Sequence, residues 1–358
     1  MVNQEKFNTI ILVSSNSVHA RRYLEGISPY FKQIVFITNN NVDIELSDKL
    51  IIKEFNFKLL NFRVQKQLAQ LINLYPDAII HVHQANSYAY HTFKALKLLK
   101  NTYKTILTTW GSDILVLPHK NRYFKKMVQF NLSVANIVTS DSLFMSSEIK
   151  KLCPEIKEIQ TINFGMKGFP DKLDLSGKEN IILSNRLHKK FYNVDKIITA
   201  FYHFTKNDYA NNDFKLIIAA SGDETTNLKN LVKEYNLQNK VFFTGMLSVN
   251  ELKELYLKAK LFISIPDSDA TSLSVLEAMG YGCYPILSNL PANLEWVING
   301  INGTICENNS ELDKIIKKSY DIISKPEEFF KIANFNYQLI KQKAIFEDNI
   351  CKFLALYN

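Results

Sequence analysis

The chain has 358 residues, enough for two domains of ordinary size, and its hydrophobic content of 46% is that of a globular protein. Its apolar runs are too short to span a bilayer, and the first of them, residues 9–13, is also too short for a signal peptide. These features argue against an integral membrane protein and predict a cytoplasmic one. The cysteines lie far apart and form no Cys-x-x-Cys pair, which predicts reduced, buried thiols rather than a disulfide framework or a zinc site.

The excess of positive over negative charge lies wholly in the first half of the chain. Residues 1–166 hold 20 Lys and Arg against 12 Asp and Glu, whereas residues 167–358 hold 23 of each kind. A basic half predicts a polyanionic partner, such as nucleic acid, an anionic membrane surface or a phosphorylated lipid. The sequence has no recognisable nucleic-acid-binding motif, so we expect no nucleic-acid partner. The basic and aromatic segment 118–129 is the best candidate for membrane contact, although a solvated helix face is the commoner role of such residues.

The first half alternates predicted strands and helices. Apolar, β-branched runs predict strands at 9–13, 34–38, 78–83, 104–109, 135–140 and 159–163. Helical periodicity or capping residues predict helices at 19–27, 58–74 and 142–152. This order is typical of a doubly wound parallel sheet. The loop after the first strand lacks the Gly-x-Gly-x-x-Gly fingerprint, which argues against an NAD or FAD site.

Polar residues follow two of these strands, at the edge where such sheets bind ligands. His81 and His83 end the strand 78–83 and lie on one face of it, because side chains alternate along a strand. The turn from Trp110 to Asp113 follows the next strand. For either histidine the alternative is a core or loop histidine with all its hydrogen bonds satisfied, which is the commoner case.

A second round of alternation follows a segment rich in Gly, Pro, Asp and Lys. We expect a first domain at 1–165, a linker at 166–178 and a second domain at 179–335, with a C-terminal helix at 336–358 that packs back on the first domain. Strands are predicted at 180–184, 214–220, 241–244, 261–265 and 284–288. Helices are predicted at 193–205, 228–235, 251–258 and 274–281, and again from residues 293 and 311.

A basic loop follows the first strand of the second half. Arg186, Lys189 and Lys190 lie in this loop, at the sheet edge where ligands bind. A guanidinium and an ammonium group there can clamp a diphosphate. The alternative is an ordinary charged surface loop.

Two acids, Asp269 and Glu277, frame the loop and helix that follow strand 261–265. Free backbone N–H groups at a helix N-terminus make an anion site, so this segment is suited to a nucleotide diphosphate, with a carboxylate on ribose or sugar hydroxyls. The alternative is a capping box, Ser274-x-x-Glu277, in which Glu277 serves only its own helix.

The motifs of residues 180–305, taken in chain order, resemble the nucleotide-binding domain of glycosyltransferase family 4. They are Asn185-Arg186-Leu187 with Lys189 close behind, Gly222-Asp223-Glu224, Val241-x-Phe243-x-Gly245, the pair Asp269 and Glu277, and the segment from Glu295 to Gly303. The first half matches more loosely, through the His81/His83 strand, the Gly111-Ser112-Asp113 turn and Gly165. The resemblance implies the GT-B fold, an α/β architecture of two Rossmann-like doubly wound domains that face each other across a cleft.

The chain also departs from the family pattern. The family usually has Gly at 185, Glu at 269 and His at 110, a glycine pair at 16–17, and glycines at 270 and 272. Here these positions hold Asn185, Asp269, Trp110, Asn16-Ser17, Ala270 and Ser272. The identity of the donor sugar therefore stays open.

The resemblance implies a retaining glycosyltransferase that needs no metal and no cofactor, with a nucleotide-sugar donor for which UDP is favoured. Asp269 would contact the donor sugar, while Arg186 and Lys190 would neutralise the leaving diphosphate. The implied nucleotide-binding residues are Glu277 on the ribose, with Lys189, Gly245, Met246, Thr271, Ser272, Leu273 and Ser274. The implied residues of the acceptor and donor-sugar cleft are Asn16, Ser17, His83, Trp110 and Asp113.

The acceptor implied is a glycan or a lipid-linked molecule of bacterial surface polysaccharide, lipopolysaccharide or glycoconjugate synthesis. The basic first domain would then contact the anionic inner face of the cytoplasmic membrane. The alternatives are a sugar-nucleotide epimerase of similar fold and a catalytically weak sugar-nucleotide-binding protein.

Overall fold

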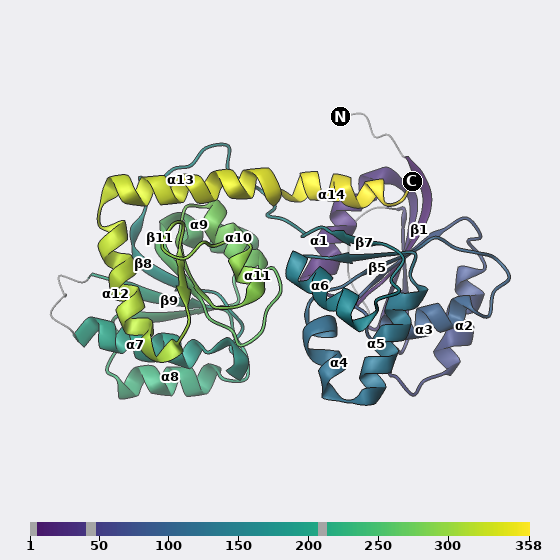
Figure 1. Ribbon diagram of the computed structural model, residues 1–358, viewed down its shortest axis with the longest axis horizontal. Coiled ribbons are helices and arrows are strands. Elements are labelled where there is room, and N and C mark those ends of the chain that lie inside the picture. Colours follow the sequence, from purple (N-terminus) through teal and green to yellow (C-terminus); the bar gives the residue numbers. More distant parts are fainter. Residues whose placement is uncertain (1–5, 41–47, 207–212) are drawn as a thin grey trace. The chain divides into compact units, whose positions relative to one another are not determined.

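The computed structural model describes residues 6–40, 48–206 and 213–358 (Figure 1). The chain divides into two compact units: unit 1 is Met1–Phe164 with Glu347–Asn358, and unit 2 is Gly165–Phe346. In the described residues, no helix has the length and apolar composition needed to cross a bilayer.

The boundaries differ from those expected, because the predicted linker 166–178 is part of unit 2. Met166 is buried in the core of unit 2 with Ile340 and Ala344. Its N–H donates to the carbonyl of Ala344 at 2.7 Å, and Phe346 N–H donates back to Met166 O at 3.0 Å. A Cβ at Gly165 would lie 2.8 Å from the carbonyl carbon of Ile345, so only glycine lets these segments run side by side. Unit 2 therefore extends to residue 346, beyond the predicted end at 335.

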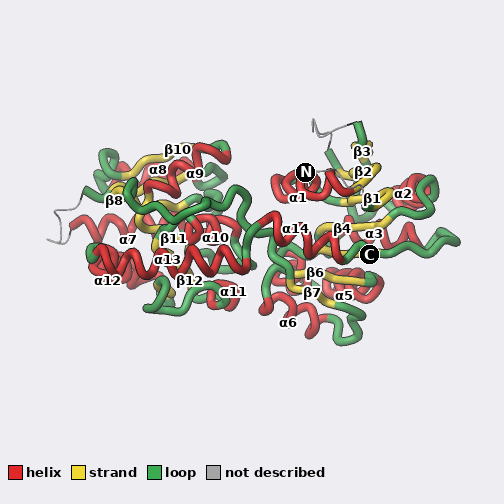
Figure 2. The backbone as a smooth tube through the Cα atoms, turned by 90° about the horizontal axis from the view of Figure 1, so that it is seen from above, coloured by secondary structure: helices red, strands yellow, loops and turns green. Residues whose placement is uncertain are grey.

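Unit 1 is a parallel sheet with helices on both of its faces (Figure 2). Its strand order is β3-β2-β1-β4-β5-β6-β7. The strands are β1 (Phe7–Val13), β2 (Phe31–Thr38), β3 (Leu50–Glu54), β4 (Ile79–His83), β5 (Thr105–Thr108), β6 (Ile137–Ser140) and β7 (Ile159–Thr161). The α-helices are α1 (Val18–Ile27), α2 (Arg63–Ile72), α3 (Ser87–Leu96), α4 (Leu117–Lys120), α5 (Arg122–Val134), α6 (Leu143–Leu152) and α14 (Phe346–Ala355).

The central strands of unit 1 form where the apolar runs predicted them. Ile10 to Val13 in β1 are fully buried, as expected for a parallel strand covered on both faces. Several elements were not predicted, among them β3, α3, α4 and α5. The edge strand β3 is half-buried or exposed along its length, and its apolar run, residues 50–52, is only three residues long. Helix α3 was not predicted because its buried face includes the polar residues His91 and Thr92.

Unit 2 has a second parallel sheet, with strand order β10-β9-β8-β11-β12-β13. Its strands are β8 (Glu179–Ser184), β9 (Lys215–Ala219), β10 (Val241–Gly245), β11 (Ala259–Ser264), β12 (Tyr284–Ser288) and β13 (Thr304–Cys306). Its α-helices are α7 (Val194–Lys206), α8 (Thr225–Glu234), α9 (Val249–Lys258), α10 (Leu273–Gly280), α11 (Pro291–Leu294), α12 (Leu312–Ile323) and α13 (Pro326–Lys343). The helix predicted from residue 293 was misplaced: it begins at Pro291 and is only 4 residues long.

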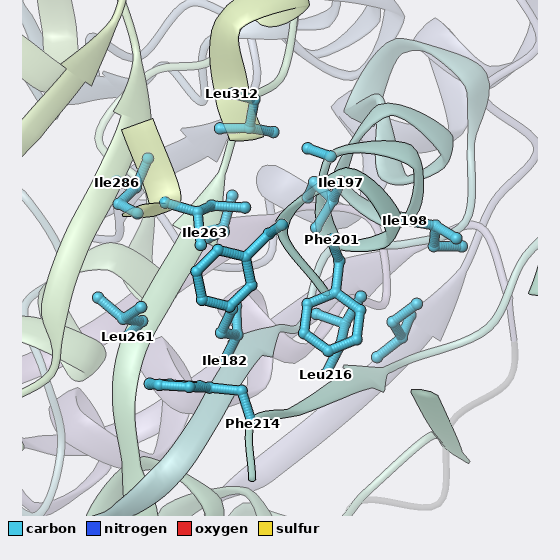
Figure 3. Packing of buried hydrophobic residues seen from close by; sticks show 14 of the residues in the cluster. Ile182, Ile197, Ile198, Phe201, Phe214, Leu216, Leu261, Ile263, Ile286 and Leu312 are labelled. Carbon is cyan, nitrogen blue, oxygen red and sulfur yellow. The ribbon is translucent and has the colours of Figure 1, made fainter. Parts of the chain in front are cut away.

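Alternating side chains of β8 enter two different cores. Ile182 packs with α7, α8 and α12 on one face of the sheet, in a cluster that also includes Phe201 and Leu312 (Figure 3). Its neighbours Ile181 and Leu183 pack with α9, α10 and the end of α13 on the other face. This double burial fixes the register of β8 and thus the position of the loop that follows it.

Candidate functional site

The predicted residues of unit 2 gather at the carboxyl ends of two neighbouring strands. β8 and β11 pair in parallel, and the loops after them carry Arg186 and Asp269. Helix α10 begins at Leu273, directly after the second loop. Because the carboxyl ends of parallel strands meet at one edge of a sheet, this topology brings together side chains that lie 83 positions apart.

Arg186 is the centre of this cluster. Its guanidinium donates to Asp269 Oδ2 at 2.7 Å, to Ser274 Oγ at 3.2 Å and to Ser272 Oγ. The guanidinium also lies over the ring of Tyr192, with the Cζ atom 4.4 Å from the ring centroid. Only 10% of the Arg186 side chain is exposed. A cation is thus fixed beside the N-terminus of a helix, where backbone N–H groups add positive potential.

Asp269 is held by this arginine and is partly buried, with 21% of its side chain exposed. Burial raises the pKa of the Asp269 carboxyl, and the charge of Arg186 together with the N–H of Ala270 offsets part of that rise. The Ala270 N–H donates to Asp269 Oδ1 at 3.1 Å. Both carboxylate oxygens therefore have a donor, which fixes the acid in one orientation.

The capping-box alternative for Glu277 is wrong. Helix α10 begins one residue earlier than predicted, with Ser272 at its N-cap and without a side-chain capping bond. Glu277 therefore lies in the second turn and not at the third helical position, where a capping box needs it. Its Oε2 atom accepts instead from the hydroxyl of Tyr256, at 3.1 Å.

The other predicted nucleotide-binding residues of unit 2 are more dispersed. Thr271, Ser272, Leu273 and Ser274 form the turn into α10 and are buried or half-buried. Lys189 and Lys190 are exposed at the start of a short 3-10 helix, residues 190–192. Gly245 ends the edge strand β10 with a φ of +72°, and Met246 after it is 68% exposed. β10 is two strands away from β8 in the sheet.

The loop after β9 is fastened to the Arg186 loop. The His188 N–H donates to Ser221 O at 3.2 Å, and the Glu224 N–H donates to His188 O at 2.9 Å. A Cβ at Gly222 would lie 2.6 Å from the carbonyl oxygen of His188. The glycine of the Gly222-Asp223 motif therefore permits the close approach of two backbones.

The predicted residues of unit 1 also lie at carboxyl ends of neighbouring strands, here β1, β4 and β5. Asn16 Oδ1 accepts from Arg21 Nε at 2.9 Å, and Ser17 caps α1 by accepting from the Ala20 N–H. Asp113 is buried, and it accepts from the N–H groups of Ala85 at 2.6 Å and Trp110 at 2.9 Å. These polar residues thus bind their own loops together.

The two histidines of β4 have different environments. His81 has the satisfied core position that the alternative predicted. Its Nδ1 lies 2.8 Å from the Tyr357 hydroxyl and its Nε2 lies 2.7 Å from Thr108 Oγ1. His83 is fully buried, and within the described part of the chain neither of its ring nitrogens has a hydrogen-bond partner. Trp110, whose ring centroid is 5.4 Å from that of His83, has a buried Nε1 that likewise lacks a partner there.

Sequence reasoning missed the residues that hold this site. Tyr256 is buried on α9 and connects Glu277 to the loop after β8, yet by its spacing it is only one more apolar position of an amphipathic helix. Tyr192, whose ring lies under Arg186, follows a run of basic residues, and no sequence pattern marks it as a site residue. Among the described residues, no three His, Cys, Asp or Glu side chains gather as metal ligands would.

Comparisons with known proteins give a consistent result for both units. A family model described as glycosyl transferases group 1 matches residues 167–338, and one described as glycosyl transferase 4-like matches residues 9–142. The N-acetyl-alpha-D-glucosaminyl L-malate synthase of Bacillus anthracis is 26% identical over 251 residues, which are 67% of this chain and 63% of that protein. The alpha-monoglucosyldiacylglycerol synthase of Streptococcus pneumoniae is 28% identical over 136 residues, 38% of this chain and 29% of that protein.

Each of these matches spans less than two thirds of the curated relative. Among solved structures, HepE from Anabaena in complex with UDP has a TM-score of 0.77 at 14% identity, covering 97% of this chain and 99% of that one. At this identity the likeness shows the fold alone, which is the GT-B fold expected from the sequence.

Proposed function

Because this chain belongs to the family 4 type of glycosyltransferases, whose models match both of its units, we propose that it transfers a sugar from a nucleotide-diphosphate sugar to a glycan or lipid-linked acceptor. The observation that carries the proposal is the fixed Arg186 guanidinium between Asp269 and the N-terminus of α10. A fixed cation beside a helix N-terminus is what a leaving diphosphate needs.

In the proposed reaction, Arg186 and the N–H groups of residues 271–274 stabilise the negative charge that develops on the leaving nucleotide diphosphate. Lys189 and Lys190 are exposed and add positive charge. Asp269 contacts the donor sugar and Glu277 binds the ribose hydroxyls. This scheme needs no metal, because cationic side chains and a helix N-terminus neutralise the charge on the leaving diphosphate.

The acceptor hydroxyl is proposed to attack from the face that the leaving group departs, so that the anomeric configuration is retained. The phosphate of the leaving group takes the acceptor proton, and no protein nucleophile is required. The donor class we favour is a UDP-linked hexose or N-acetylhexosamine, since HepE was solved with UDP and the two curated relatives are named for glucosyl and N-acetylglucosaminyl products.

We place the acceptor at the carboxyl edge of unit 1. The buried ring nitrogens of His83 and Trp110, which lack partners in the described residues, are groups whose hydrogen bonds a sugar hydroxyl can complete. Arg122, Lys125 and Lys126 are exposed on α5, which supports contact between unit 1 and an anionic membrane surface where a lipid-linked acceptor would lie. The pathway proposed is bacterial surface polysaccharide, lipopolysaccharide or glycoconjugate synthesis.

The test is calorimetric titration of the whole chain with UDP, GDP and ADP. We expect one nucleotide to bind and Arg186→Ala to weaken it by about 2 to 4 kcal/mol, because a charged hydrogen-bonded clamp on a diphosphate is lost. The matched control is Lys258→Ala, which removes an exposed cation at the opposite, amino end of the sheet. If none of the three nucleotides binds, or if both variants bind alike, the proposal fails.

A second measurement distinguishes an active transferase from a protein that only binds the sugar nucleotide. Release of free UDP from UDP-sugars, followed with and without added acceptor, is expected to exceed the uncatalysed rate. Binding without any release would favour the alternative of a sugar-nucleotide-binding protein that has lost its activity.

A further inference from the structure

A buried tyrosine lies between two residues of the candidate nucleotide site. Tyr256, near the end of α9, is 1% exposed. Its hydroxyl lies 2.7 Å from Asn185 Nδ2 in the loop after β8, and 3.1 Å from Glu277 Oε2 on α10. One hydroxyl group thus joins three elements of unit 2 that are distant in sequence.

The direction of the hydrogen bonds in this group is determined by chemistry. A carboxylate can only accept, so the single proton of the Tyr256 hydroxyl points to Glu277. The hydroxyl oxygen then accepts from the amide of Asn185. The opposite orientation of that amide would present two acceptors to one proton. Burial, together with the neighbouring Glu277 charge, raises the pKa of Tyr256 well above its usual value, so the hydroxyl keeps its proton at neutral pH.

We infer that Tyr256, itself oriented by Asn185, is a positioning residue that holds the Glu277 carboxylate in the orientation that binds the ribose hydroxyls of the nucleotide. The inference rests on the proposed function, because it assigns to Glu277 a ribose ligand. It also gives a reason for Asn185, where the family usually has glycine: a glycine would leave the hydroxyl of Tyr256 without its donor.

The geometry supports positioning through several independent contacts. Lys178 Nζ donates to the backbone carbonyl of Tyr256 at 2.8 Å, and Cys283 Sγ donates to the same oxygen at 3.2 Å. The ring of Tyr281 stacks on the ring of Tyr256 with an angle of 16° between the planes. A ring fixed at its backbone and at one face places its hydroxyl in a single position, which is the requirement for orienting a ligand group through a second residue.

The experiment measures discrimination between ribose and deoxyribose. The dissociation constants of the tightest of UDP, GDP and ADP, and of its 2′-deoxy and 3′-deoxy forms, are compared for the whole chain and its variants. We expect the unmodified chain to prefer the ribonucleotide over at least one deoxy form. Tyr256→Phe should raise the dissociation constant of the ribonucleotide about tenfold. The dissociation constant of that deoxy form should change by no more than about twofold, so that the discrimination is lost.

Two further variants keep the test decisive if Tyr256→Phe folds poorly. Asn185→Asp replaces the donor by an acceptor and draws the Tyr256 proton away from Glu277, so it should also abolish the discrimination. The matched control is Tyr284→Phe. Tyr284 is as buried as Tyr256, and its hydroxyl lies 2.8 Å from Thr304 Oγ1, so the variant loses a tyrosine hydrogen bond outside the Asn185–Tyr256–Glu277 group. We expect it to lower the melting temperature and to keep the discrimination.

The possible outcomes test the proposed function and the positioning role of Tyr256 separately. If no nucleotide binds to the unmodified chain, the proposed function fails. If the ribonucleotide binds with clear discrimination and both Tyr256→Phe and Asn185→Asp retain it, the positioning role is refuted while the proposed function stands. If the unmodified chain does not distinguish ribose from either deoxy form, Glu277 is not a ribose ligand and the inference is overturned.

Discussion

The buried histidine pair of β4 makes unit 1 sensitive to mild acid. Burial lowers the pKa of His81 to about 3, and burial with the nearby charges of His81 and His19 lowers the pKa of His83 well below its usual value. In the unfolded chain both return to about 6.5. Below that pH the unfolded state therefore binds more protons than the folded state, so stability is full above pH 6.5 and is lost as the pH falls.

The expected loss follows from the lowered pKa of both histidines in the folded state. Between pH 7 and pH 5.5, each histidine that stays neutral in the folded state costs about 1.3 kcal/mol of unfolding free energy, or about 2.5 kcal/mol for the pair. His83→Leu should remove half of this dependence. At pH 7 the variant should be no less stable, because it removes ring nitrogens that have no partner in the described residues.

The assay is urea unfolding at pH 7 and pH 5.5, followed by tryptophan fluorescence. The chain has two tryptophans, so Trp296→Phe leaves Trp110 as a reporter of unit 1 alone. The His83→Leu variant is compared in this same background, which cancels the titration of all other groups. Equal losses of stability in the two proteins would refute the assignment of His83 as a neutral buried base.

Three other predictions concern packing, a backbone contact and the basic face of α5. Phe201→Ala, at a fully buried position of the unit 2 core, should cost about 3 to 5 kcal/mol by chemical unfolding, whereas Phe330→Ala, at a position 54% exposed, should cost under about 1 kcal/mol. Gly222→Ala should cost at least about 1 to 3 kcal/mol, because its Cβ meets a backbone carbonyl at 2.6 Å; Gly177→Ala, which has open space around it, is the control, and equal melting temperatures would contradict the packing argument. Replacing both Lys125 and Lys126 by Glu should weaken binding to anionic vesicles, measured by co-sedimentation, by at least about 2 kcal/mol, or about 30-fold. Unchanged binding would remove α5 from the proposed membrane surface.

The sequence predicted most strands of the parallel sheets because their buried parts are apolar, β-branched runs. Residues 10–13 of β1 and 261–263 of β11 are wholly buried, and burial on both faces is what such runs indicate. The pattern fails where burial is partial or polar. The apolar run of the edge strand β3 is only three residues long, and the buried face of α3 carries His91 and Thr92, so neither element has a pattern strong enough to predict it.

The candidate site was predictable in its residue types but not in its internal bonds. A cation after one strand and an acid after another suggested a shared edge, and Arg186 and Asp269 do pair there at 2.7 Å. The contact of Tyr256 with Glu277 joins residues 21 positions apart on different helices. No local pattern encodes such a contact, since it depends on how α9 and α10 pack on the same face of the sheet.

Five of the departures from the family pattern fall into two physical kinds. Asn185, Asp269, Asn16 and Ser17 all make hydrogen bonds within the chain, so each replaces a usual residue by one that the fold itself uses. Trp110 differs, because its buried Nε1, like the ring nitrogens of the neighbouring His83, has no partner in the described residues. Buried polar atoms without partners are costly, and a ligand that completes their bonds recovers that cost on binding. On the function proposed above, Trp110 and His83 are therefore the positions where a substrate hydroxyl gains hydrogen bonds, whereas Asn185 and Asp269 in unit 2 already make theirs within the chain.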